Sequence, residues 1–107
     1  MAVGDLVRLC DRGDVPPGTA RRFDVPGHRV ALVRLDDDWY AIGDRCSHED
    51  YSLSEGDIWP EECEIECPKH GSVFDLRTGE ARTLPATGAV PVYSVRVEGD
   101  DVILELP

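Results

Sequence analysis

The sequence lacks an apolar run long enough to cross a membrane, and its first ten residues lack the basic-then-apolar layout of a secretory leader. We therefore expect a cytoplasmic protein without membrane contact. Internal repeats, low-complexity tracts and linker-like stretches are also absent, so residues 1–107 are expected to form a single domain. A domain this small buries limited apolar surface, and a metal centre that joins loops would add stability.

Positive charge is scarce, and one segment has none. The chain has 11 Lys and Arg residues against 22 Asp and Glu, which gives a formal net charge of −11. Residues 49–66 hold eight of these acids and no basic residue. This charge disfavours nucleic acid and anionic membranes as partners. It fits either a solubilising acidic face or a partner protein with a basic docking patch, and charge alone does not decide between them.

A sustained helical period is also missing, and short β-strand patterns take its place. The expected strands are 6–9, 21–25, 30–35, 39–42, 63–66, 72–76, 90–97 and 102–106. Turn signals at Asp36–Asp38 and Glu98–Asp101 indicate two hairpins. So many short strands predict an all-β fold, a small antiparallel β-sandwich or barrel. Residues 44–71 would then form two loops around one further hairpin.

Only four cysteines are present, and two of them stand beside histidines at metal-ligand spacing. Cys46 and His48 form one pair, and Cys67 and His70 form the other. A β-hairpin across residues 49–66 would return the second pair beside the first. Two thiolates and two imidazoles would then face one another, a donor set that suits an iron–sulfur cluster or zinc.

Zinc, a disulfide and a catalytic dyad are the alternatives to a cluster. Common zinc sites place two Cys in one loop and two His in another, whereas each loop here carries one of each. A Cys46–Cys67 disulfide would leave both histidines without a role. A Cys–His dyad would not need the motif twice. The spacing therefore favours the cluster over all three.

The remaining chemically reactive and aromatic residues are interpreted as structural. His28 is expected on the surface, in an exposed turn between strands. Cys10 and Cys63 are expected to be buried free thiols that pack as small apolar residues. The residues expected to pack rather than to conduct electrons are Phe23, Trp39, Tyr40 and Trp59.

The pattern C-x-H followed by C-x-x-H resembles the Rieske iron–sulfur family. The stretch Cys67–Ser72, with Phe74-Asp75 and Thr78-Gly79 after it, is similar to the family's second cluster loop and its exit turn. Leu84-Pro85-Ala86 resembles the proline-containing loop that covers the cluster. Because Pro91–Val95 and the last hairpin also fit, the resemblance runs over essentially the whole chain. It implies a fold of the Rieske type with a two-loop cluster-binding subdomain at about residues 44–86.

The resemblance also implies the cofactor and its ligands. One [2Fe–2S] cluster is expected, and its four ligands are Cys46 and Cys67 on one iron and His48 and His70 on the other. The family position of Ser72 implies a hydroxyl bonded to a bridging sulfide, and that of Pro85 implies a cover over the cluster. Rieske proteins of cytochrome bc complexes carry an extra disulfide between these loops. Tyr51 and Lys69 occupy the matching places here, so that bridge is not expected.

Among its branches, the chain most resembles stand-alone bacterial ferredoxins, including ferredoxin subunits of non-haem iron oxygenases. This implies an electron carrier rather than an enzyme, a ferredoxin component of a multicomponent dioxygenase. It would take electrons from a flavin-dependent reductase and pass them to an oxygenase, and we expect it to be a monomer.

An alternative function stays open at this point. Tyr51–Gly56 and Thr83–Ala86 resemble small actinobacterial members encoded beside iron–sulfur assembly genes. The chain could accordingly be a non-shuttling redox sensor or an accessory factor in cluster assembly. Nitrite reductase small subunits share the fold but typically lack these ligands, which disfavours that interpretation.

Overall fold

The computed structural model describes residues 6–46, 51–69, 71–84 and 88–106. The expected ligands His48 and His70, and Pro85 of the third loop, lie outside the described residues. Strands dominate the rest, and two short 3-10 helices join them, in this order: β1 (Leu6–Asp11), η1 (Arg12–Asp14), β2 (Thr19–Val25), β3 (His28–Leu35), β4 (Asp38–Gly43), η2 (Leu53–Glu55), β5 (Asp57–Trp59), β6 (Glu64–Glu66), β7 (Val73–Asp75), β8 (Val92–Glu98) and β9 (Asp101–Glu105). The expectation of an all-β fold is confirmed.

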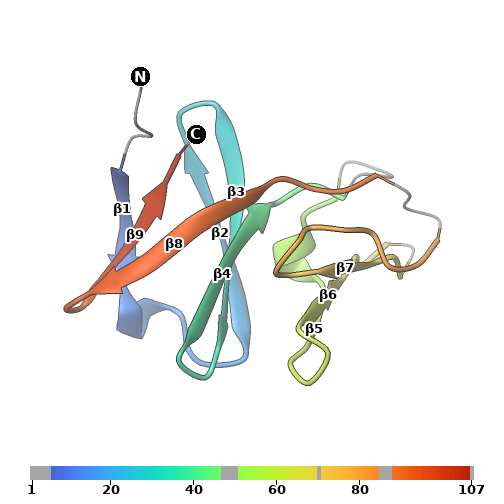
Figure 1. The fold of residues 1–107 in the computed structure, drawn as a ribbon, viewed down its shortest axis with the longest axis horizontal. Helices are drawn as coiled ribbons and strands as arrows, with labels where there is room; N and C mark the ends of the chain where they lie inside the picture. Colours follow the sequence, from blue (N-terminus) through green and yellow to red (C-terminus); the bar gives the residue numbers. More distant parts are fainter. Residues whose placement is uncertain (1–5, 47–50, 70, 85–87, 107) are drawn as a thin grey trace.

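The strands form two antiparallel sheets. The larger sheet has six strands in the order β1-β9-β8-β4-β3-β2, and the smaller has three in the order β5-β6-β7. Figure 1 shows the small sheet beside the large one, at the end where β4 leaves the large sheet and β8 enters it. No helix in the described part of the chain is long and apolar enough to span a membrane.

Strand β3 lies between two hydrophobic cores. Its alternate residues point to opposite faces, as in any strand. Val30 and Leu32 face one core, with Val102 and Leu104 of β9. Ala31, Val33 and Leu35 face the other core, whose members come from the large sheet, the small sheet and the segments around the motif cysteines: Ile42, Cys46, Leu53, Ile65, Cys67, Phe74, Leu76 and Val90. The continuous apolar run of β3 therefore reflects burial on both faces, and the second core joins the two sheets.

The hairpin expected across residues 49–66 is present in its described part. Strand β5 pairs with β6 in antiparallel register, with Asp57 opposite Glu66 and Ile58 opposite Ile65. The sequence pattern did not indicate β5 as a strand, because it stands between Gly56 and Pro60, two residues that are typical of turns. Strand β6 then leads directly into Cys67, which lies in the same core as Cys46.

Expectations for three single residues were wrong in whole or in part. His28 is not in an exposed turn: it is the first residue of β3, is half-buried, and has its Nδ1 atom 3.0 Å from the Tyr93 hydroxyl. Cys63 is half-buried in a turn before β6, where its backbone adopts a φ of 57°. Trp59 is 46% exposed and donates its indole N–H to Glu66 Oε1 at 3.1 Å. Cys63 nevertheless packs against the core that joins the two sheets, so only its full burial was wrongly expected.

Candidate metal centre

Two of the four expected ligands are described, and both are buried. The side chains of Cys46 and Cys67 are each 1% exposed and belong to the core that joins the two sheets. Cys46 follows strand β4, and Cys67 follows strand β6. Neither cysteine is in a disulfide, which contradicts the disulfide alternative. Segments from different sheets thus carry two sulfur donors into one buried region.

The backbone closes around each cysteine in the same way. The Cys46 N–H donates to the carbonyl of Tyr51 at 2.9 Å, and the Cys67 N–H donates to the carbonyl of Ser72 at 2.7 Å. Each bond joins a cysteine to the residue five positions later. In the second loop, the Gly71 N–H also donates to the Cys67 carbonyl at 3.1 Å, and the φ of Gly71 is +74°, a conformation that favours glycine. We name the segments 46–51 and 67–72 the first and second cluster loops. In sequence, each encloses one expected histidine.

A cation and an aromatic ring from the two cluster loops are in contact. The Lys69 ammonium nitrogen lies 5.3 Å from the centroid of the Tyr51 ring. The two cluster loops are therefore joined at this point by a contact between side chains.

A buried carboxylate supports the start of the first cluster loop. Asp44 is fully buried, and its Oδ1 atom accepts the backbone N–H of Ser54 at 2.7 Å. Its own N–H donates to the carbonyl of Arg29 on β3 at 2.9 Å. Asp44 thus ties the approach to Cys46 to both β3 and η2. Sequence reasoning missed this residue, because an Asp at the end of a strand usually signals only a turn.

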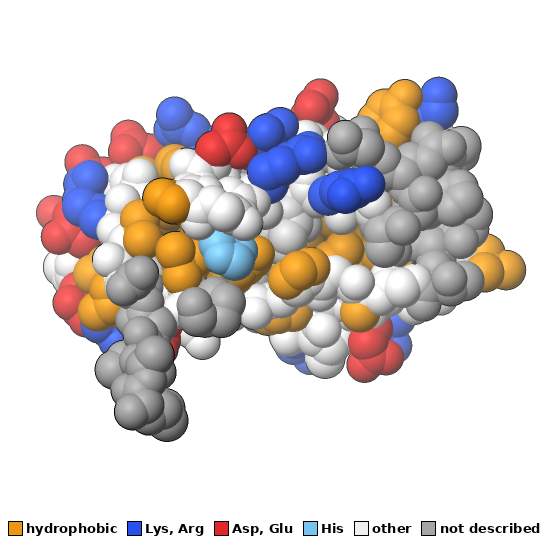
Figure 2. Space-filling model, turned by 90° about the horizontal axis from the view of Figure 1, so that it is seen from above, with side chains coloured by type: hydrophobic (Ala, Val, Ile, Leu, Met, Phe, Trp, Pro, Cys, Tyr) orange, Lys and Arg blue, Asp and Glu red, His pale blue; other side chains and the backbone are white. Residues whose placement is uncertain are grey.

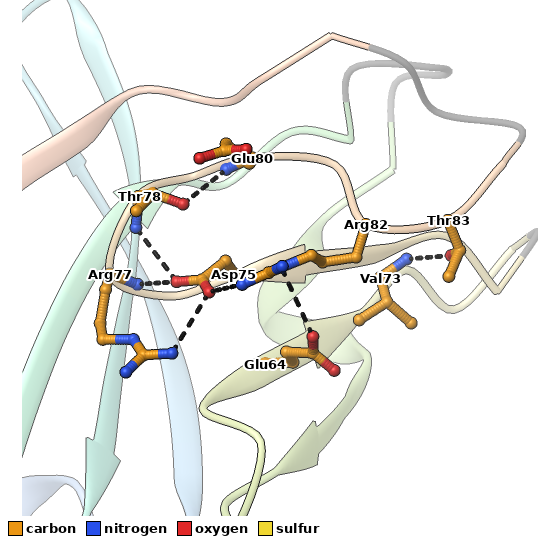
Figure 3. Close-up of polar contacts among 8 residues, drawn as sticks. All are labelled: Glu64, Val73, Asp75, Arg77, Thr78, Glu80, Arg82 and Thr83. Carbon is orange, nitrogen blue, oxygen red and sulfur yellow. Dashed lines mark hydrogen bonds and ion pairs between the residues drawn. The ribbon is translucent and has the colours of Figure 1, made fainter.

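A second buried carboxylate supports the exit from the second cluster loop (Figure 3). Asp75 is 1% exposed and accepts the backbone N–H groups of Arg77 and Thr78 at 2.7 and 3.2 Å, and the Arg82 guanidinium at 2.6 Å. Burial is the largest single influence on the Asp75 pKa and raises it. The hydrogen bonds from Arg82, Arg77 and Thr78 together outweigh burial and lower the pKa to about 2.

The same network fixes the segment that leads toward the third loop. Arg82 also lies 3.7 Å from Glu64 on β6, and its backbone N–H donates to the Val73 carbonyl at 2.6 Å. The Val73 N–H in turn donates to the Thr83 hydroxyl at 2.9 Å. Leu84, the next residue, is 76% exposed. The family resemblance marked Asp75 only as part of a motif, and its pairing with Arg82 had no sequence signal.

Ser72 and Phe74 are both fully buried in the second cluster loop and strand β7. Phe74 pairs with Ile65 across β6 and β7 and packs in the core. Ser72 offers its carbonyl to Cys67, as described above. The bond of its hydroxyl to a sulfide stays a prediction.

The surface beside the first cluster loop carries positive charge. A hollow of about 540 Å³ has His28, Arg29, Arg45 and Cys46 in its lining. Figure 2 shows Lys and Arg side chains gathered on one face of the molecule, near a histidine coloured pale blue. The acidic character of the chain is therefore not uniform around the site.

The described donor atoms fit an iron–sulfur cluster. Thiolates are soft ligands that favour such clusters, and both sulfurs lie where water is excluded. Among the described residues, no group of three or more His, Cys, Asp or Glu side chains is placed to hold a metal. The imidazole half of the expected donor set lies outside that part of the chain.

Comparison with known proteins shows likeness over almost the full length. Residues 5–94 match the family model described as the Rieske [2Fe-2S] domain. The chain is 44% identical over 101 residues to the 3-phenylpropionate/cinnamic acid dioxygenase ferredoxin subunit of Escherichia coli (strain K12), and the match covers 94% of this chain and 93% of that relative.

Solved structures agree with the sequence match. The ferredoxin of carbazole 1,9a-dioxygenase from Nocardioides aromaticivorans IC177 is 40% identical with a TM-score of 0.90, covering 95% of this chain and 97% of that one. A structure described as a complex of reduced oxygenase and oxidized ferredoxin in carbazole 1,9a-dioxygenase contains a chain that is 36% identical. Its TM-score is 0.86, and the match covers 94% of this chain and 92% of that one.

Proposed function

The chain belongs to the family of Rieske [2Fe-2S] domains, and from this we propose that it is an electron carrier that supplies an oxygenase. It carries one [2Fe–2S] cluster and performs no catalysis itself. The observation that carries the proposal is the pair of buried cysteines outside any disulfide, each in a segment closed by the same kind of backbone hydrogen bond.

We assign the four ligands to Cys46 and Cys67 for one iron and to His48 and His70 for the other. When bound, the cluster supplies one-electron chemistry at about −150 to +300 mV, the range of Rieske centres. The protein contributes the two thiolates, their exclusion from water and the closed loops that hold them. The cluster-binding subdomain is proposed at about residues 44–86 within one domain, 1–107.

The oxygenase partner is supported by the relatives. One is named a dioxygenase ferredoxin subunit, and another is described as a ferredoxin in complex with an oxygenase. A flavin-dependent reductase is proposed as the electron donor, and a basic docking patch on the partner would suit the acidic segment. The described acids that are exposed there are Glu55, Asp57, Glu61 and Glu62. Cytoplasmic location and a monomeric state stay predictions.

Stopped-flow kinetics tests the proposed function. The protein is reduced with a flavin-dependent reductase and NADH, and then mixed with the oxygenase component of an aromatic-ring dioxygenase. We expect rapid reoxidation of the cluster. The change in its visible absorption measures this rate. Slow reoxidation, together with stable binding to an iron–sulfur assembly protein, would support the accessory role instead.

The four cysteines offer an internal control for the ligand assignment. Cys46→Ser and Cys67→Ser should each lose the cluster, because each removes one thiolate. Cys10→Ser and Cys63→Ser should keep about two irons and two acid-labile sulfides per chain. Cys10 is a buried residue of β1 and Cys63 lies in the turn before β6, so neither belongs to a cluster loop. Loss of iron from these two variants as well would overturn the assignment.

A further inference from the structure

Tyr51 and Lys69 each lie beside a backbone hydrogen bond of a cysteine, one in each cluster loop. The Tyr51 carbonyl accepts the N–H of Cys46 and so closes the first loop. Lys69 lies in sequence between Cys67 and Gly71, whose backbones are joined by the hydrogen bond from the Gly71 N–H to the Cys67 carbonyl. A shift of either side chain would therefore move backbone that lies close to a cysteine.

The contact between the two side chains is a cation–π interaction. The ammonium nitrogen of Lys69 is 5.3 Å from the Tyr51 ring centroid, within the roughly 6 Å range of cation–π attraction. Tyr51 is 39% exposed and Lys69 is exposed, so neither is held in place by burial. Lys69 is also the only lysine of the chain, since every other basic residue is arginine.

We propose that Tyr51 and Lys69 are positioning residues that clasp the two cluster loops together. The clasp joins the two loops through exposed side chains, outside the buried core that holds the cysteine sulfurs. It also keeps one positive charge beside the centre. This inference rests on the proposed function, because the loops are taken to enclose a cluster.

Two disruptive variants and two conservative ones test the clasp. Tyr51→Leu removes the ring, and Lys69→Met removes the charge but keeps an unbranched chain of similar length. Tyr51→Phe keeps the ring, and Lys69→Arg keeps a cation that also binds aromatic faces. The first readout is the rate at which visible absorption is lost in the presence of an iron chelator.

We expect cluster loss to be about two- to fivefold faster in Tyr51→Leu and in Lys69→Met, the range that corresponds to one exposed cation–π contact. The double variant should be no faster than the worse single variant, because both substitutions break the same contact. The two conservative variants should behave like the unchanged protein. Additive effects, or equal damage from Tyr51→Phe and Tyr51→Leu, would overturn the clasp.

A second readout does not need the cluster. Because Lys69 is the only lysine, its acylation by an N-hydroxysuccinimide ester can be followed as one mass shift in one peptide. Tyr51→Leu should raise the acylation rate about two- to fivefold, and Tyr51→Phe should not change it. Unchanged acylation in Tyr51→Leu would refute the contact. Absence of a cluster from the unchanged protein would instead refute the proposed function.

A third readout is the midpoint potential by voltammetry. Lys69→Met should lower it, because loss of a positive charge favours the oxidised, less negative cluster. Lys69→Arg should restore it. A purely structural role for Lys69 would leave the potential unchanged, and that result would limit the clasp to loop restraint and contradict the proposed charge effect.

Discussion

Among single residues, His28 serves as a matched control for the two histidines expected to bind iron. His48→Ala and His70→Ala should each lose the cluster, because each removes one imidazole from the same iron. His28→Ala removes a hydrogen bond to Tyr93 and should cost about 1 kcal/mol of stability while the cluster is retained. Measurements of iron and acid-labile sulfide, together with visible spectra, show whether each variant retains its cluster. A cluster that survives loss of His48 or His70 would show that the ligand set is wrong.

The carboxylate of Asp75 has the clearest pH dependence of the described groups. Its pKa is lowered to about 2 from an ordinary value of 3.8, so the folded state holds the charged form more strongly than the unfolded state does. The stabilisation is therefore complete above about pH 4 and is lost as the pH falls toward about 2. A shift of this size corresponds to about 2 kcal/mol.

Replacing Asp75 with Asn tests this directly. The variant loses the ion pairs to Arg82 and Arg77, so we expect a loss of about 2 kcal/mol at neutral pH. The stability difference from the unchanged protein should shrink as the pH falls from about 4 toward 2. Urea unfolding across this range measures it. Asp100→Asn, in the exposed β8–β9 turn, is the control and should leave the profile unchanged. A constant difference at all pH values would contradict the role of the Asp75 charge.

At the scale of elements, the start of strand β5 depends on a glycine. A Cβ atom at Gly56 would lie 1.7 Å from the carbonyl oxygen of Glu66 on β6, whereas one at Gly13 would meet nothing within 4 Å. Gly56→Ala should therefore push β5 from β6 and destabilise the fold by about 2–3 kcal/mol. Gly13→Ala should change stability by less than about 0.5 kcal/mol. Thermal unfolding compares them, and equal small effects would mean that the close approach at Gly56 is readily relieved.

The strands that alternation or apolar runs mark clearly could be predicted from the sequence. Strands β3, β4, β8 and β9 were expected to within a few residues, because each is long enough to show its pattern. The short strands β6 and β7 were also expected, whereas β5 was not, because Gly56 and Pro60 border it and are typical of turns. The pairing of β1 with β9, which joins the two ends of the chain, depends on contacts that no local pattern encodes.

The candidate site divides in a similar way. Cys46 and Cys67 were predicted from ligand spacing, and the structure buries both. Their supports, Asp44 and Asp75, were not predicted, because a buried carboxylate has the same sequence appearance as one in a solvated turn. Their roles depend on partners far along the chain or in the backbone, such as the Ser54 amide. The candidate metal ligands can thus be predicted from a local sequence motif. The residues that hold those ligands in position cannot, because they act through tertiary contacts.

At the scale of the whole molecule, charge is unevenly placed around the site. Two sets of three acidic residues can be neutralised separately, each with the same change in net charge. Comparing them tests whether the location of the acids matters. The loop triplet is Glu49, Asp50 and Glu55, where Glu49 and Asp50 lie outside the described residues and follow His48 in sequence. The turn triplet is Asp37, Glu61 and Glu62, which are exposed in the β3–β4 and β5–β6 turns. Glu64, at the start of β6, is not used because it is half-buried.

Neutralising the loop triplet with amides should slow electron transfer with a basic partner more than neutralising the turn triplet. Both changes remove three negative charges, but charges near the docking site steer the encounter most strongly. At low salt we expect the second-order rate to fall by about tenfold for the loop triplet and by about twofold or less for the turn triplet. The salt dependence should also flatten for the loop triplet, because screening at about 0.15 M salt acts over about 8 Å. Stopped-flow rates at several salt concentrations measure both quantities. Equal effects would point to net charge alone, and no effect from either would leave the acidic segment as a solubility feature.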